Sequence, residues 1–217
     1  MDKKVLDQQS QHWEKSFSSK PEMFGLEPSF PAKKSLEIFK KNNFKSILEL
    51  GAGLGRDTIY FAQNSIRVHA LDYSKSAIET INDKSKKLGL EEFIETKIFD
   101  VRETFKFDDN IFDGCYSHML YCMALTDNDI KNLNKEIHRI IKPNGINIYT
   151  VRNTLDGDYR KGTHRGEDLY EMNGFIINYF SEQKIKDNLD GFNNLSTENF
   201  EEGNFPRRLY YVVNQKK

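Results

Sequence analysis

Ile47-Leu48-Glu49-Leu50-Gly51-Ala52-Gly53-Leu54-Gly55-Arg56-Asp57 is the most informative stretch of this chain. Its first four residues are mostly apolar, three glycines spaced two apart follow, and a helical spacing of apolar residues begins directly after them. This order predicts a strand, a tight turn and a helix. Glycine tolerates positive φ and lets a ligand approach the bare backbone, while a helix start offers unpaired N–H groups. The stretch therefore predicts a ligand-binding turn.

The spacing of these glycines separates two classes of ligand. A dinucleotide-binding turn has the pattern Gly-x-Gly-x-x-Gly, and counted from Gly51 its last position is Arg56. A long cationic side chain fits poorly there, and the third glycine, Gly55, comes one residue early. The pattern Glu49-x-Gly51-x-Gly53-x-Gly55 instead resembles the first motif of class I S-adenosylmethionine (SAM) dependent methyltransferases. The resemblance implies that the glycines face the methionine part of SAM and that Glu49 helps to hold its amino group.

A carboxylate ends the second predicted strand. The strand Arg67–Leu71 leads into Asp72, 21 residues after the first glycine. A carboxylate at this place can accept hydrogen bonds from both hydroxyls of a ribose, in NAD as well as in SAM. Ser74 or Ser76 can cap the following helix, Ser76 in a capping box with Glu79, so Asp72 is left for the ligand.

The third predicted strand, Phe93–Phe99, ends in Asp100-Val101. The resemblance implies that Asp100 accepts a hydrogen bond from the adenine amine and that the next backbone N–H meets the ring. The positions that the resemblance assigns to the cofactor are Glu49, Gly51, Ala52, Gly53, Gly55, Asp72, Tyr73, Asp100, Val101 and Ser117.

The fourth predicted strand, Ile111–Tyr116, runs into Ser117-His118-Met119-Leu120-Tyr121. In open α/β sheets a ligand sits beyond the carboxyl ends of the strands where their order reverses, which places this segment beside the ligand. His118 and Tyr121 are the candidates for a general base, and a purely orienting or packing role is the alternative for His118. The segment lacks the Asn/Asp-Pro-Pro-aromatic motif of methyltransferases that act on exocyclic amines of nucleic acid.

The remaining pattern completes a fold prediction. A helix over Thr126–Ile141 precedes Pro143-Asn144-Gly145, which resembles the Leu-Lys-Pro-Gly-Gly turn of class I methyltransferases, and a fifth strand follows. Asn194–Phe200 and Arg208–Val213 predict two final strands. The resemblance implies an α/β fold: a Rossmann-like, seven-stranded, mostly parallel, doubly wound sheet with an antiparallel edge pair and helices on both faces.

Two flanking segments have open interpretations. Residues 1–30 are polar but carry Trp13 and Phe17, which predicts either a cover over the site or a packed terminal arm. Residues 152–180 are too long for an ordinary connection, so they form either a substrate-side insert or a solvated loop. The basic candidates for an anionic group of the substrate are Arg152, Arg160, His164 and Arg165.

Composition narrows the class of protein. The 217 residues, of which 37% are hydrophobic, suffice for one domain over 1–217. Lys plus Arg (32) nearly balances Asp plus Glu (33), so we expect no nucleic-acid and no membrane partner. Without a long apolar span or a secretory signal, we expect a cytoplasmic protein. The spacing of Cys115 and Cys122 is not a metal-ligand pattern. We therefore expect both to be reduced thiols and expect no metal site.

Together these features predict an enzyme that transfers a methyl group from SAM to a small molecule. A SAM-binding or S-adenosylhomocysteine-binding module without catalysis is the first alternative, and a nicotinamide-dependent oxidoreductase is the second, which Arg56 disfavours. The sequence leaves open which atom of the acceptor is methylated and what the oligomeric state is.

Overall fold

A seven-stranded sheet organises the part of the chain that the computed structural model describes, residues 3–20, 22–203 and 207–217. Its strand order is β3-β2-β1-β4-β5-β10-β9. Within this sheet β10 runs antiparallel to both of its neighbours, and the other pairs are parallel. The strands are β1 Ser46–Leu50, β2 Arg67–Asp72, β3 Ile94–Ile98, β4 Phe112–His118, β5 Ile141–Arg152, β9 Phe192–Glu202 and β10 Arg207–Lys216. The predicted fold is confirmed.

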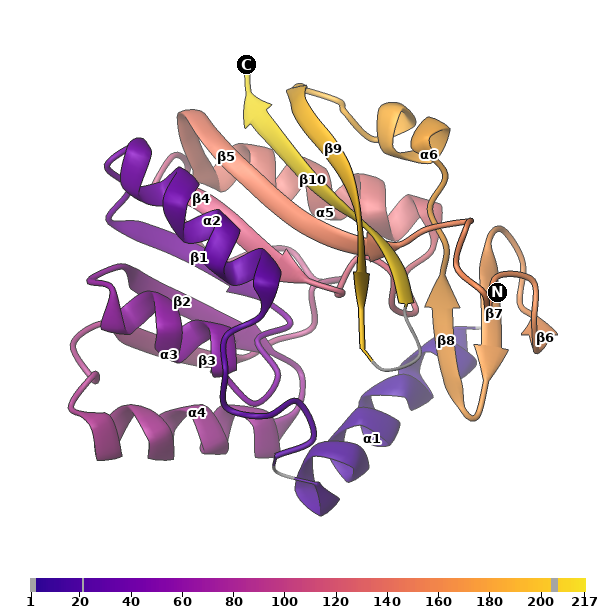
Figure 1. The fold of residues 1–217 in the computed structure, drawn as a ribbon, viewed down its shortest axis with the longest axis horizontal. Coiled ribbons are helices and arrows are strands. Elements are labelled where there is room, and N and C mark those ends of the chain that lie inside the picture. Colours follow the sequence, from indigo (N-terminus) through magenta and orange to yellow (C-terminus); the bar gives the residue numbers. More distant parts are fainter. Residues whose placement is uncertain (1–2, 21, 204–206) are drawn as a thin grey trace.

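Helices cover both faces of this sheet (Figure 1). One apolar core lies between the sheet and the helices α2, α3 and α4, and the other lies between the sheet and α5 with α6. Burying apolar side chains on both faces stabilises such a layered domain by about 25 cal/mol for each Å² removed from water. The helices are α2 Phe30–Lys41, α3 Arg56–Gln63, α4 Lys75–Leu88, α5 Asp127–Ile140 and α6 Glu182–Asp187.

Local sequence signals set the helix starts. The Ser29 side chain caps α2, with a proline in its first turn, and Thr126 with Asp129 forms a capping box on α5. Ser74 caps α4 by accepting from the N–H of Ala77 at 3.1 Å. The predicted capping box of Ser76 with Glu79 is wrong, because Ser76 donates instead to Glu14 of α1.

The first helix and a small second sheet lie beside the ends of the central strands. α1, Lys3–Ser19, runs from the small sheet to α4 (Figure 1). The small sheet is antiparallel and consists of β6 Thr163–His164, β7 Leu169–Met172 and β8 Phe175–Asn178. Residues 152–180 are therefore anchored by regular structure. No helix within the described ranges is long and apolar enough to span a membrane.

The glycine turn between β1 and α3 is tightly packed at one position. Gly51, Gly53 and Gly55 have φ values of 66°, 53° and 80°, a region that costs other residues about 1–2 kcal/mol. A Cβ at Gly55 would lie 2.5 Å from Cγ1 of Ile81 in α4. Gly55 thus lets α3 and α4 approach each other closely.

Gly55→Ala should lower the free energy of unfolding by about 2–5 kcal/mol, because backbone strain adds to overpacking against Ile81. Gly89→Ala is the matched control: it has a φ of 65° but nothing within 4 Å of the added Cβ, so strain alone acts there. Urea unfolding of both variants measures the difference. Equal losses would contradict the packing role.

Candidate functional site

A cavity of about 630 Å³ lies beyond the carboxyl ends of β1 and β4, where the strand order reverses. Its walls come from the glycine turn, the ends of β2 and β4, α1, and β8 of the small sheet. This is the place at which open α/β sheets bind ligands, and the volume suits a small-molecule ligand.

Acidic side chains form the floor of this cavity beneath the glycine turn. Glu49 is buried, and its Oε2 accepts from the hydroxyl of Thr58 at 2.6 Å. Oε1 has no hydrogen-bond partner among the described residues. Burial, reinforced by the negative charge of nearby Asp57, raises the pKa of Glu49 well above its usual range. A cationic ligand beside Glu49 would favour the ionised form of this side chain.

Asp72 occupies its predicted place at the end of β2. Its carboxylate accepts from the N–H of Gly53 at 2.9 Å and from the N–H of Ser74 at 2.9 Å. Burial raises the pKa of Asp72 to about 6, against the lowering effect of these hydrogen bonds. Asp72 lines the cavity and also fixes the turn that it faces.

Asp57 is a cavity residue that sequence reasoning missed. Its Oδ1 accepts from the N–H of Ser29 at 2.8 Å, and its Oδ2 accepts from the hydroxyls of Ser29 at 2.7 Å and Tyr116 at 2.9 Å. An aspartate in the first turn of a helix is commonly explained by the helix dipole, so its sequence position gave no further signal. The contact joins the segment before α2 to the glycine turn.

On the opposite side, Tyr73, Asp100 and Val101 line the cavity as predicted. The Asp100 carboxylate is held by Arg102, whose Nη2 lies 2.6 Å from Oδ2. Arg102 also forms an ion pair with Asp7 of α1 at 3.0 Å. The predicted adenine side of the site is thereby tied to the first helix.

His118 ends β4 and faces the cavity with both ring nitrogens engaged. Nδ1 lies 2.8 Å from the hydroxyl of Thr150, and Nε2 lies 3.2 Å from Oε2 of Glu202. Burial alone would raise the pKa of Glu202, but the hydrogen bond with His118 and the nearby charges of Arg56 and Arg207 lower it below its usual value. Sequence reasoning missed Glu202, because β9 reaches the site from the far end of the chain.

Tyr121 and Ser117 lie outside the cavity lining. Tyr121 is fully buried; its hydroxyl donates to Asn134 at 2.8 Å and accepts from Asn147 at 3.1 Å, and its ring stacks on Tyr149. Ser117 is also fully buried, and its hydroxyl has no partner in the described part of the chain. Neither side chain lines the cavity, so their roles in the site stay predictions. Successive residues at the end of a strand point to opposite sides, and His118 takes the cavity side.

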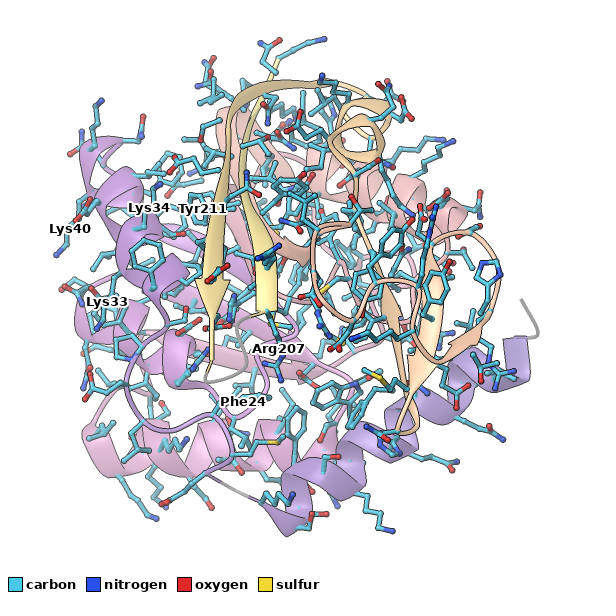
Figure 2. All side chains as sticks on the ribbon, turned by 45° about the vertical axis from the view of Figure 1, so that its right-hand side comes forward. Phe24, Lys33, Lys34, Lys40, Arg207 and Tyr211 are labelled. Carbon is cyan, nitrogen blue, oxygen red and sulfur yellow. The ribbon has the colours of Figure 1, made fainter. Side chains whose placement is uncertain are left out.

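α1 forms one wall of the cavity. Trp13 and Phe17 line it, with ring centroids 5.3 Å apart, and Trp13 also packs on Phe175 of β8 at 4.8 Å. Phe17 reaches the glycine turn, since a Cβ at Gly53 would lie 3.7 Å from its ring. Phe24 and Arg207, which are labelled in Figure 2, also line the cavity.

Of the four basic side chains predicted to contact the substrate, one lines the cavity and three do not. Arg152 is buried and lines the cavity, but its guanidinium is bound to Asp156 and to Asp158. The other three lie outside the cavity lining: Arg160 is exposed, His164 contacts the carbonyl of Glu167 at 2.9 Å, and Arg165 pairs with Glu171. In this structure none of the three lines the cavity, and local partners hold His164 and Arg165, so their substrate role stays a prediction.

Residues 47–145 match the family model described as a methyltransferase domain. Over that stretch, which is less than half of the chain, the protein is similar to methyltransferase domains. A curated relative, the biotin biosynthesis bifunctional protein BioHC of Teredinibacter turnerae, is 30% identical over 108 residues. That match covers 46% of this chain and 18% of the relative.

Solved structures show the same methyltransferase fold. The Burkholderia thailandensis 1,6-didemethyltoxoflavin-N1-methyltransferase has a TM-score of 0.78 at 17% identity, covering all of this chain and 91% of that one. A SAM-dependent methyltransferase from Methanosarcina mazei has a TM-score of 0.69 at 20% identity, covering 82% and 96%.

SAM is the cofactor of this methyltransferase domain family, and the cavity residues fit it. SAM carries positive charge on its ammonium and its sulfonium. Glu49, Asp72 and Asp100 all line the cavity, and Oε1 of Glu49 is available as an acceptor. Within the glycine turn, Gly53 leaves the most room against the backbone, where a Cβ would lie 3.7 Å from Phe17.

Glu49→Gln should make the protein without cofactor more stable at high pH and should weaken its binding of SAM. Since the folded-state pKa of Glu49 lies above 4.5, wild-type protein without cofactor loses stability as the pH rises above that value, and glutamine does not. At pH 8 the variant should be more stable by about 1–3 kcal/mol, with no gain at pH 4. SAM should bind about 10–100-fold more weakly, because a charge-assisted contact is lost. Chemical unfolding at both pH values and calorimetry measure these effects, and unchanged SAM affinity would contradict the assignment.

Proposed function

We propose that this protein transfers the methyl group of SAM to a small-molecule acceptor. The observation that carries the proposal is the acidic floor of Glu49, Asp57 and Asp72 under the glycine turn. Buried carboxylates attract the ammonium and sulfonium of SAM and repel the pyrophosphate of a nicotinamide dinucleotide. This supports a methyltransferase over an oxidoreductase.

The shape of the cavity favours a small acceptor. α1 and β8 meet over it through Trp13 and Phe175, which cover part of the cavity. The toxoflavin-type relative, whose structure holds 1,6-didemethyltoxoflavin and S-adenosylhomocysteine, resembles this chain over its full length. We take 1–217 to act as one domain, in the cytoplasm, without a nucleic-acid or membrane partner.

The residues described here would mainly align the reactants and exclude water. SAM supplies an activated methyl group on a positively charged sulfur, which leaves as a neutral thioether. Holding the acceptor in line with that methyl group can lower the reaction barrier by about 7–11 kcal/mol. The aromatic wall of Trp13, Phe17 and Phe175 removes water from the reacting centre.

Calorimetric titration with SAM, S-adenosylhomocysteine and NAD tests the cofactor. We expect binding of the first two and none of NAD. Transfer of a labelled methyl group to a panel of small acceptors then separates an enzyme from a binding module. A protein that binds SAM and methylates no acceptor would be the non-catalytic module, and NAD binding would overturn the proposal.

Deleting residues 1–20 should reduce methyl transfer by at least tenfold, because Trp13 and Phe17 would no longer shield the reacting centre. The two main cores contain no residue of α1, so the free energy of unfolding should fall much less in proportion. Initial rates with the best acceptor and urea unfolding measure the two effects. A truncated protein that turns over at the full rate would contradict the covering role.

A further inference from the structure

His118 has no ring nitrogen left for a substrate. Nδ1 faces the hydroxyl of Thr150 at 2.8 Å, and Nε2 faces Oε2 of Glu202 at 3.2 Å. The Thr150 hydroxyl also accepts from the N–H of Met119 at 2.9 Å, which fixes it in place. An imidazole that is bonded at both nitrogens orients its neighbours and does not take a proton directly.

Glu202 retains accepting capacity on the cavity side. Its Oε2 meets His118, while its Oε1 lies 3.6 Å from Nη2 of Arg56, too far for a hydrogen bond. The side chain is 26% exposed and lines the cavity. An ionised carboxylate offers about four lone-pair positions, so Glu202 can accept one more proton-bearing group.

Glu202 lies near the methionine end of the predicted cofactor site. Arg56, the residue directly after the last glycine of the turn, pairs with it. His118, its other partner, precedes Leu120, whose Cβ would lie 3.1 Å from a Cβ added at Gly51. The methyl group of SAM would be presented at this end of the glycine turn.

The cavity that Glu202 lines also has aromatic and thioether side chains in its wall. They include Trp13, Phe24, Met123, Met172 and Phe175. Flat rings and polarizable sulfur pack well on an aromatic ligand. A flexible aliphatic or strongly charged acceptor would gain less from such a surface.

We propose, on the basis of the proposed function, that the acceptor is an aromatic compound with an N–H or O–H group and that Glu202 takes its proton. His118 and Thr150 are positioning residues that hold the Glu202 carboxylate. The acceptor nitrogen or oxygen loses its proton to Glu202 and uses the freed electron pair to bond the methyl carbon. The carbon–sulfur bond breaks, sulfur keeps its electron pair, and Glu202 later returns the proton to solvent.

Glu202→Gln tests this role with acceptors of similar shape and different acidity. For weakly acidic phenols and N–H heteroaromatics, kcat/KM should fall about 100-fold or more. For nitrophenols that are already ionised at the assay pH, it should fall less than about fivefold, because no proton has to be removed. The calorimetric Kd for S-adenosylhomocysteine should stay within about twofold of wild type, showing that the cofactor site is intact.

The pH profile separates a base from a structural contact. The groups that face Glu202 are His118 from β4, Arg56 from α3 and Arg207 from β10. With weakly acidic acceptors, kcat/KM of the wild type should fall at low pH because Glu202 becomes protonated. This fall should be absent in Glu202→Gln. Thr150→Ser, which keeps the hydroxyl, should retain activity, and Thr150→Val should lower kcat.

Glu201→Gln is the matched control, since the neighbouring Glu201 is exposed and pairs with Arg208 outside the cavity. It should leave rates unchanged. Equal losses for acidic and weakly acidic acceptors in Glu202→Gln, or wild-type rates with both, would overturn the role of Glu202 while leaving methyl transfer established. If wild-type protein binds SAM but methylates no acceptor, the proposed function fails, and this inference fails with it.

Discussion

The acidic floor under the glycine turn is the constraint on which the site depends. Glu49 and Asp72 are carried there by the ends of adjacent strands, and Asp57 is carried there by the first turn of α3. Burial and the nearby charges of Asp57 and Asp72 raise the pKa of Glu49, so the ionised form of Glu49 is unfavourable until a cation arrives. Functional sites commonly keep such strain because it gives a cationic ligand a strong preference for that place.

Contacts close in sequence were predictable, and contacts brought together by the fold were not. Glu49 and Asp72 follow from motif spacing, because a strand end and a glycine turn place them by local geometry alone. Glu202 comes from β9, and its meeting with His118 depends on β10 lying between β5 and β9. No short pattern encodes that pairing.

The differences between prediction and structure have an equally local cause. Arg165 was predicted to face a substrate because it is basic and lies in a turn-rich segment, but Glu171 on the neighbouring strand neutralises it. Tyr121 follows the fourth strand by only a few residues, yet its ring turns into the core to stack on Tyr149. Charge and proximity in sequence predict a neighbourhood, whereas the direction of a side chain is set by its partners.

Arg56 shows how one departure from a motif can reorganise a site. A dinucleotide-binding turn requires a small residue at this position so that the helix can approach the strand. Here Gly55 instead lets α3 approach α4, and Arg56 lines the cavity, donating to the carbonyl of Phe24 at 3.0 Å and pairing with Glu202 at 3.6 Å. The residue that disfavours a pyrophosphate ligand thus joins the segment before α2 and β9 to the glycine turn, so one side chain connects three parts of the cavity wall.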